Sequence, residues 1–346
     1  MSNSLKKNAE KRFGVAAAVL AVTMAIVIAA SCRLDAAAYS DDYAFRYLPI
    51  NFTEITSFEF ALELGYFEAE GVKVVELEGE AGGGANVITS LAAGVADIGN
   101  AAPPAEINAI AAGAPIKIIY GGPAVAHEKY PGIQLLLRSD SEISSVDDLR
   151  GKTIAVSSFG AMNEYFVRIA LAKAGVSKSE VTLLRVPMSQ HSQVLESNQV
   201  DAASTGSPIA DYIIEHGIGK RLTDLYHALG DDLAGNGWGY FINTDVLAKH
   251  PEGAKKLVSA LVKSDEWVEA NPNEARKIVR KIFEKRGQNP DLANYWFPIK
   301  LVNHGFWEDK NIRFWIDFLI DDKKIKEGQV KPSDIYTNEY NPYYGK

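Results

Sequence analysis

The sequence predicts an α/β fold of two similar lobes that face one another as a clamshell. Two stretches that lie 104 residues apart follow one pattern, because Leu91 to Pro104 and Leu195 to Pro208 place Leu, Gly or Asn, Asp and Pro at identical offsets. Gly94 and Asn198 stand where a helix closes in the left-handed conformation. A short apolar strand follows each Asp, and Pro suits the first turn of the next helix. Such a repeat indicates two sheets of the same order, one in each half of the chain.

The other elements follow from hydrophobic periodicity and from the residues that begin and end helices. Before each copy of the repeat we expect a strand, a helix and a strand, at 45–49, 55–64 and 72–77 and again at 153–157, 163–174 and 181–186. Further strands are predicted at 116–120, 134–138 and 239–243, with a short capped turn at 144–152. Late helices are predicted at 251–271, 272–286 and 311–320, and the aromatic-rich stretch 291–307 is expected to pack helices onto a lobe. The predicted lobes are 44–137 plus 238–346, which includes a helical C-terminal region, and 138–237.

The N-terminal segment is typical of an export signal. Four cations between Lys6 and Arg12 precede an uncharged run at 14–30, and Cys32 follows directly. We therefore expect residues 1–31 to be a signal peptide, Cys32 to be lipidated, and 32–43 to form a tether. Cleavage after Ala38 and an uncleaved anchor are the alternatives. Each of these outcomes places the folded part outside the cytoplasm, in the periplasm or at the cell surface.

Composition excludes several classes of protein. A single cysteine in 346 residues cannot form an intramolecular disulfide framework or a Cys/His zinc site. The net charge of −8 argues against nucleic acid and against anionic membrane surfaces as partners. The six histidines form no HxH or HExxH pair, and no G-x-S-x-G elbow is present. We expect a monomer that is not an enzyme and that uses no metal and no cofactor.

Ligands of open α/β sheets bind at the carboxyl ends of the strands, and here two such edges would face each other. Several loops at these edges precede helices, whose N-terminal N–H groups suit an oxyanion. The candidate ligand-binding residues are Asn51, Phe52, Thr53, Gly84, Asn100 and Ala101 in the first lobe, Ser158, Phe159, Gly160, Ala161, Met162, Asn163, Gln190, Thr205, Gly206 and Ser207 in the second, and Trp238 at the crossing between them. Trp238 is equally compatible with packing at the hinge. Asp97 and Asp201 are expected to bond local backbone in turns.

Four motifs carry a resemblance to a known family. These are the Gly65–Gly71 turn, the stretch Ser90–Asn100, the stretch Val146–Val156 and the His250–Gly253 start of a late helix. In this order they resemble the nitrate/sulfonate/taurine family of solute-binding proteins over residues 44 to about 285. The resemblance implies a two-lobed periplasmic-binding-protein fold that serves an ABC importer, with a permease and its ATPase as partners. It also implies that the loop at 157–163 contacts the ligand.

The leading functional hypothesis is capture of a small anionic organic solute, such as a sulfonate, a taurine-like compound or an aromatic acid. Phe52, Phe58, Phe159, Met162 and Trp238 suggest an apolar or aromatic body behind the anionic head. One alternative is a ligand-sensing or partner-binding lipoprotein that works without transport. Another is a protein that binds or makes a thiamine pyrimidine precursor, although this chain lacks the cysteine-rich motif of those relatives. The identity of the ligand stays open at this stage.

Overall fold

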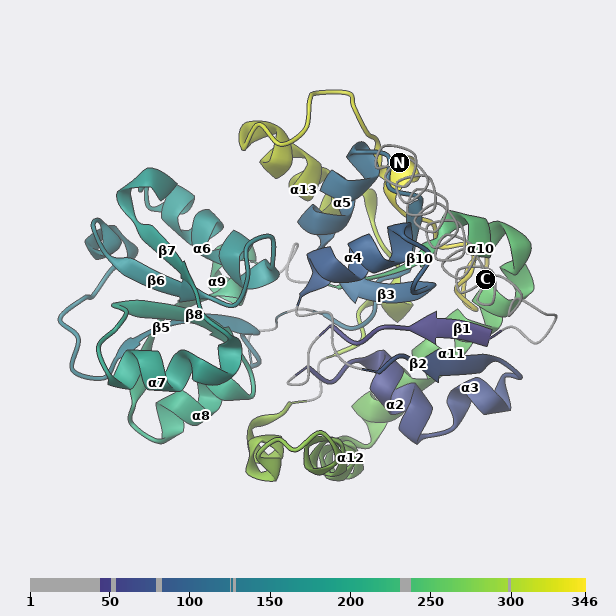
Figure 1. Cartoon of the computed structure of the whole chain (residues 1–346), viewed down its shortest axis with the longest axis horizontal. Coiled ribbons are helices and arrows are strands. Elements are labelled where there is room, and N and C mark those ends of the chain that lie inside the picture. The colour runs from purple at the N-terminus through teal and green to yellow at the C-terminus, as the bar shows by residue number, and fades with distance from the viewer. Residues whose placement is uncertain are drawn as a thin grey trace, which may run out of the picture. The chain divides into compact units, whose positions relative to one another are not determined.

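The computed structural model describes residues 44–50, 54–78, 83–124, 126, 129–230, 238–297 and 300–346. The expected signal peptide, Cys32 and the tether lie outside these residues. In the described part of the chain, no helix combines the length and the apolar character that crossing a membrane requires. Two five-stranded mixed sheets flanked by helices make up the fold, which confirms the predicted α/β class (Figure 1).

The first sheet has the strand order β2-β1-β3-β10-β4. Its strand β1 is parallel to β3, whereas β10 is antiparallel to both β3 and β4. Each strand lies within two or three residues of its predicted limits. The bounds are β1 (Ala44–Tyr47), β2 (Lys73–Glu76), β3 (Ile98–Ala101), β4 (Ile116–Tyr120) and β10 (Gly239–Asn243).

The second sheet has the order β7-β6-β8-β5-β9, which repeats the first sheet position by position. Strand β6 is parallel to β7 and β8, and β5 is antiparallel to β8 and β9. The bounds are β5 (Ile133–Arg138), β6 (Thr153–Val156), β7 (Thr182–Arg185), β8 (Ala202–Gly206) and β9 (Gly219–Asp224). In both sheets the antiparallel fourth strand is the first one formed after the chain crosses from the other sheet.

This topology corrects one predicted boundary. The sequence placed the first crossing at residue 137, which falls inside β5. That strand pairs with β8 along its length, from Ile133 opposite Gly206 to Leu137 opposite Ala202. The second lobe therefore includes Ile133, and the chain crosses before it. Because the strand is buried on both faces, its sequence carries no signal for the sheet to which it belongs.

Helices cover both faces of each sheet. In Figure 1, α4, α5 and α13 lie above the first sheet and α2, α3 and α11 below it, whereas α6 and α9 lie above the second sheet and α7 and α8 below it. The bounds are α2 (Ser57–Glu63), α3 (Tyr66–Ala69), α4 (Gly84–Ala92), α5 (Pro103–Ala111), α6 (Met162–Lys173), α7 (His191–Glu196), α8 (Ile209–Glu215), α9 (Leu225–Leu229), α10 (Thr244–Lys249), α11 (Pro251–Ala270), α12 (Pro272–Lys285), α13 (Asp309–Asp321) and α14 (Pro332–Ile335). The predicted late helices agree with α11, α12 and α13 to within about two residues.

The repeat has the same structural role in both lobes. Gly94 and Asn198 have φ angles of 72° and 57°, so both occupy the left-handed conformation that ends a helix. Asp97 then accepts a hydrogen bond from the backbone N–H of Arg46 at 2.8 Å, and Asp201 accepts one from the backbone N–H of Thr153 at 2.8 Å. These bonds reach β1 and β6, which hold the same position in the two sheets, across 51 and 48 residues. The expectation of local turns was therefore wrong, and the two aspartates fasten neighbouring strands.

The C-terminal region contacts both lobes. Helix α13 packs against α5 of the first lobe, and Asp322 at its end pairs with Arg168 on α6 of the second lobe. The 3₁₀ segment Pro290–Tyr295, called η4, packs against α12. It also places Tyr295 edge-on to Tyr212 on α8, at 5.7 Å between ring centroids. The C-terminal region thus places side chains between the two sheets, where they can line a cavity.

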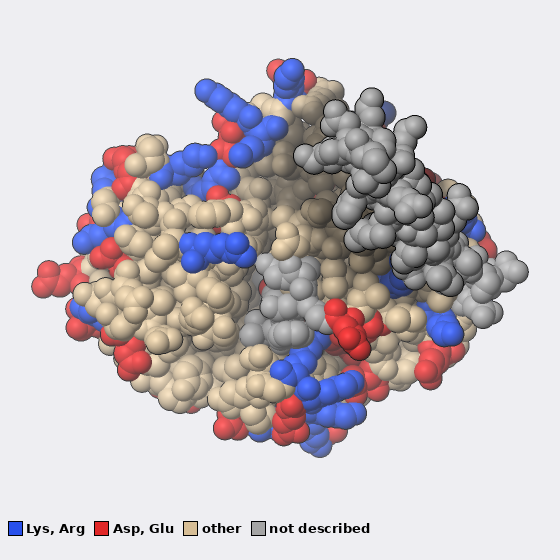
Figure 2. Space-filling view, in the orientation of Figure 1, with Lys and Arg blue, Asp and Glu red and all other residues tan. Residues whose placement is uncertain are grey.

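On the face of the molecule shown in Figure 2, charge is not collected into one zone. In Figure 2, acidic and basic side chains are intermixed around the periphery of the face shown. Several of them form ion pairs between elements, such as Lys281 on α12 with Glu63 on α2 at 2.7 Å. Exposed pairs of this kind contribute roughly 0–1 kcal/mol each to stability.

Candidate ligand-binding site

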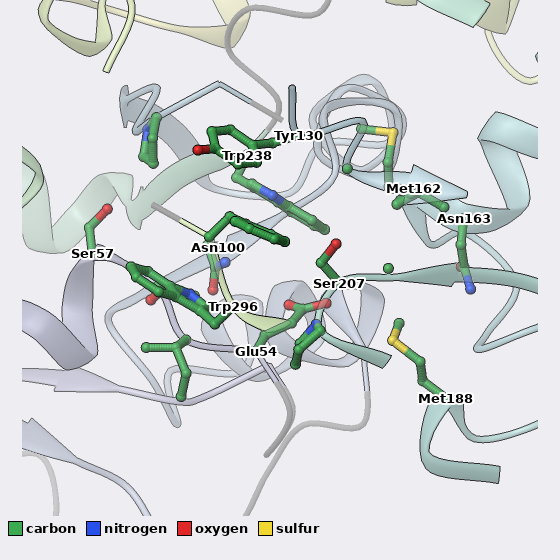
Figure 3. A pocket seen from close by; sticks show the side chains of 18 of the residues that line it. Glu54, Ser57, Asn100, Tyr130, Met162, Asn163, Met188, Ser207, Trp238 and Trp296 are labelled. Carbon is green, nitrogen blue, oxygen red and sulfur yellow. The ribbon is translucent and has the colours of Figure 1, made fainter. Parts of the chain in front are cut away.

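A cavity of about 180 Å³ lies between the two sheets and is lined by residues of both lobes. It is somewhat larger than the engineered cavity of about 150 Å³ that binds benzene, so it has room for a compact aromatic molecule. Figure 3 shows Ser57, Asn100 and Trp296 on one side of this first cavity and Met162, Asn163 and Met188 on the other. Its aromatic lining consists of Phe60, Tyr130, Trp238, Tyr240, Trp296 and Phe297.

The cavity lies at the carboxyl ends of the parallel strands, where the sequence predicted a site. Asn100 is on β3, Ser157 directly follows β6, and Ser207 directly follows β8. The side chain of Asn100 is buried, and its Oδ1 has no hydrogen-bond partner among the described residues. A buried amide oxygen without a partner is costly unless a water or a ligand satisfies it. Asn100 is therefore a strong candidate for ligand contact.

Asn163 has a different position from the one expected of a ligand-binding amide. Its Oδ1 accepts a hydrogen bond from Ser157 Oγ at 3.0 Å, and its Nδ2 donates to the backbone oxygen of Ser204 at 3.1 Å. The hydroxyl of Ser204 donates in return to the backbone oxygen of Asn163 at 2.9 Å. Although Asn163 lines the cavity, its polar atoms hold the start of α6 against β6 and β8. It is better described as a residue that positions the loop.

Sequence reasoning missed Asp265, which α11 inserts into the first cavity. Its Oδ2 accepts hydrogen bonds from Ser57 Oγ at 2.8 Å and from Tyr120 Oη at 2.6 Å. Burial is the main cause that raises the pKa of this carboxyl to about 7. The sequence does carry a signal for this residue, because Asp265 continues the apolar helical stripe of Leu257 and Leu261. A carboxylate on such a stripe must be buried.

The aromatic stretch 291–307 also contributes to the site. Trp296 and Phe297 line the first cavity, and Phe297 stacks on Tyr130 at 4.8 Å between ring centroids. Trp296 additionally packs on Phe60 of α2 at 5.4 Å. The expected packing of this stretch onto helices is confirmed by Trp296 on Phe60, and two of its aromatic residues line the cavity as well. An aromatic residue packs against a helix or a ligand with the same chemistry, so composition could not separate the two roles.

A second, more polar cavity of about 260 Å³ adjoins the first. The two share Glu54, Ser157, Ala161, Met162, Met188 and Trp238. The starts of α4 and α6 face it through Gly83, Gly84 and Ala161, and Arg185 at the end of β7 supplies a cation. By contrast, none of the described residues that line the first cavity is Lys or Arg. The cleft thus combines an aromatic part that contains Asp265 with a polar part that contains Arg185.

Comparison with known proteins places this site in a family. Residues 52–275, more than half of the chain, match the family model described as NMT1/THI5 like. The chain belongs to the NMT1/THI5-like family.

Curated relatives of this NMT1/THI5-like protein are distant in sequence. "Putative binding protein BAB2_1146" of Brucella abortus (strain 2308) is 24% identical over 208 residues, which are 57% of this chain and 62% of the relative. Riboflavin-binding protein RibY of Chloroflexus aurantiacus is 27% identical over 233 residues, which are 67% of this chain and 63% of the relative. The chain thus spans less than two thirds of the length of the curated relatives that it matches.

Solved structures establish the fold of the NMT1/THI5-like protein. The alkanesulfonate-binding protein SsuA from Xanthomonas axonopodis pv. citri, bound to MOPS, superposes with a TM-score of 0.69. The alignment covers 86% of this chain and 99% of SsuA at 18% sequence identity. The two-lobed periplasmic-binding-protein fold that the sequence motifs implied is therefore confirmed.

The predicted site residues fall into four groups. Those that line the first cavity are Asn100, Ala161, Met162, Asn163, Gly206, Ser207 and Trp238, and those that line only the second are Gly84, Ser158 and Gly160. Those that line neither cavity are Ala101, Phe159, Gln190 and Thr205. Asn51, Phe52 and Thr53 lie outside the described residues. Most predicted residues at the strand ends thus converge on one cleft.

The four residues away from the cavities have evident surroundings. Ala101 packs against the start of α4, where a Cβ on Gly84 would lie 2.6 Å from the Ala101 Cβ. Thr205 is fully buried within β8, whereas Phe159 is 57% exposed. Gln190 is the N-cap of α7 and is accessible to solvent. Their side chains thus line neither cavity.

Proposed function

We propose that this NMT1/THI5-like protein is the solute-binding component of an ABC importer and that it captures a small aromatic acid between its lobes. The observation that carries the proposal is the cleft itself, which both lobes line and which joins an aromatic cavity to a polar one. A ligand that fills it contacts both sheets at once. It would therefore stabilise the closed arrangement of the lobes, which is the form that such receptors present to a permease.

Aromatic stacking would supply most of the affinity for the body of the ligand. Trp238 lines both cavities, and Trp296, Phe297 and Tyr130 line the first. Stacked or edge-on aromatic pairs contribute roughly 0.5–1.5 kcal/mol beyond the burial of their area. The relative named as a riboflavin-binding protein, whose ligand is a flat aromatic molecule, is consistent with such a lining.

The polar cavity would receive the acidic group. Arg185 supplies a positive charge, and the first turns of α4 and α6 direct backbone N–H groups to the same space. Each helix N-terminus contributes about 0.3–1 kcal/mol toward an anion when exposed and up to about 2 when partly buried. A carboxylate, sulfonate or phosphoryl group satisfies these donors. The MOPS bound to the alkanesulfonate-binding protein is itself a sulfonate.

A thermal-shift and calorimetric screen of the purified protein tests the proposal. The panel contains aryl carboxylates, aryl sulfonates, taurine, alkanesulfonates, nitrate, pyrimidines and riboflavin. A ligand at about a hundred times its dissociation constant adds roughly 2.7 kcal/mol to the unfolding free energy. We expect a saturable shift with aryl acids. If no compound shifted the melting temperature, the proposal that the protein is a receptor for a small aromatic acid would be refuted.

Two variants localise the binding within the cleft. Arg185→Gln should weaken the binding of aryl acids more than the binding of uncharged aromatic compounds, whereas Trp238→Ala should weaken the binding of both. The matched control is Arg313→Gln, because Arg313 is exposed on α13 and lines neither cavity. An equal effect of Arg185→Gln and Arg313→Gln would exclude the polar cavity as the acid subsite.

We further propose that the protein is exported and carries a lipid on Cys32, which would keep it near its permease. A single acyl chain gives only reversible attachment, so a stable anchor needs more than one. Fractionation of cells that express the full chain tests this point. The wild type should sediment with membranes and the Cys32→Ser variant should not. A wild type found entirely in the soluble exported fraction would favour cleavage after Ala38 instead.

A further inference from the structure

Asp265 has an oxygen that the protein itself does not use. Its side chain is only 6% exposed, and both hydroxyl donors, Ser57 Oγ and Tyr120 Oη, approach the same oxygen, Oδ2. Oδ1 accepts no hydrogen bond from the residues that the structure describes, although the side chain lines the first cavity. This oxygen is open to the cavity rather than enclosed by protein. A ligand that displaces water from it must supply a hydrogen-bond donor in exchange, because a carboxyl oxygen left without one costs free energy.

Among the described residues that line the cavity, no Lys or Arg compensates the charge of Asp265. The titratable groups that face it are the phenols of Tyr120 on β4 and Tyr240 on β10, and Glu266 on its own helix. Burial raises the pKa of both phenols, so they stay neutral near pH 7. Burial likewise raises the pKa of Asp265 to about 7. The carboxyl group can therefore exchange a proton with a ligand near neutral pH.

A second unused acceptor lines the same cavity. Asn100 Oδ1 is buried and has no partner among the described residues. The aromatic lining would hold a flat ring, and its polar acceptors would meet the ring edge. An unsubstituted hydrocarbon ring edge has no N–H or O–H to offer to such acceptors, so it would leave them unsatisfied.

We infer that the aromatic part of the ligand is a nitrogen heterocycle, whose ring nitrogen or amino group shares a proton with Asp265 Oδ1. In the charged state Oδ1 accepts a hydrogen bond from a ligand N–H. In the protonated state Oδ1–H donates to a ring nitrogen. The proton lies between the two atoms in either case, and no bond between heavy atoms forms or breaks. This inference rests on the proposed function, and it narrows the ligand class of that same cleft.

Matched pairs of probes test the inference. Pyridine-3-sulfonate is compared with benzenesulfonate, and nicotinate with benzoate, because each pair differs by one ring nitrogen in place of a CH group. Calorimetric dissociation constants are measured between pH 5 and 8 for the wild type, Asp265→Asn and Glu269→Gln. Glu269 lies one turn further along α11 and is exposed, so its variant controls for the loss of a carboxylate.

We expect the wild type and Glu269→Gln to bind the nitrogen-containing member of each pair at least about tenfold more tightly. In Asp265→Asn this preference should fall below about threefold, and its pH profile should lose the component that the wild type shows near pH 7. The melting temperature of the ligand-free variant verifies that it is folded. A purely structural role for Asp265 would lower that temperature without changing the preference.

Each other outcome has a defined meaning. If both members of a pair bind the wild type equally, the inference is overturned, while the proposed function as a receptor for aromatic acids is unaffected. If Asp265→Asn keeps the full preference, Asp265 is not the group that recognises nitrogen, and the inference is again overturned. If no probe binds and the wider panel also gives no shift, the proposed function fails and the inference fails with it.

Discussion

Replacing Asn163 by Ala should destabilise the ligand-free protein, because the side chain makes one buried and one partly buried hydrogen bond within its own lobe. These are the bond from Ser157 Oγ at 3.0 Å and the bond to the Ser204 backbone oxygen at 3.1 Å. Each bond contributes about 1 kcal/mol net, so the expected loss of unfolding free energy is about 2 kcal/mol. The Asn163→Asp variant should lose at least as much, because a second acceptor would then face the Ser204 carbonyl.

Urea denaturation of the ligand-free protein measures this loss, with Lys173→Ala as the control. Lys173 lies on the same helix and is exposed, and a surface substitution of this type changes the unfolding free energy by less than about 0.5 kcal/mol. If Asn163→Ala proved as stable as Lys173→Ala, the reasoning would be refuted. The amide of Asn163 would then be available to contact a ligand, as the sequence had suggested.

Three further predictions concern stability. Lowering the pH from about 6.5 to about 4 should remove up to about 3 kcal/mol that depends on His191. Burial lowers the pKa of this side chain to about 4 in the folded state, whereas the unfolded state takes up the proton near 6.5. Urea midpoints of His191→Gln across this range should therefore fall less than those of the wild type, and parallel curves would contradict the assignment. Gly84→Val should cost about 1–3 kcal/mol in the same assay, because even its Cβ would lie 2.6 Å from the Cβ of Ala101; a stable variant would show that α4 can shift. Asp97→Ala should cost about 3 kcal/mol and Asp201→Ala about 1, because their side chains are 1% and 36% exposed. Equal losses would show that burial does not distinguish the two aspartates.

Local patterns were sufficient to predict most of the fold. Strands β4 and β10 have the predicted limits, and Gly94 and Asn198 adopt the left-handed conformation that their identities suggested. These predictions succeeded because they depend on residues that are close in sequence. The boundary inside β5 failed, because the choice between two sheets depends on a partner strand about 70 residues away.

The candidate site shows the same division. Asn100 and Ser207 could be placed in the cleft because they end or follow strands of a repeated sheet. Asp265 and Trp296 could not, since the direction in which a late helix packs is set by contacts across the whole lobe. Asn163 was placed in the right loop, but the sequence could not show that its amide bonds protein, because a buried amide can bond protein or ligand with equal geometry.

The sequence by itself determined the α/β class, the duplicated sheets and the location of the cleft, because these follow from periodicity, turn residues and strand ends. Only the tertiary structure decided which side chains meet in the cleft. It brings Asp265 of α11 beside Ser57 of α2, 208 positions apart in the chain, and leaves Asp265 Oδ1 without a donor among the described residues. Such a contact depends on how apolar faces pack against one another. An apolar helical stripe specifies that its residues are buried, but it does not specify which residues they contact.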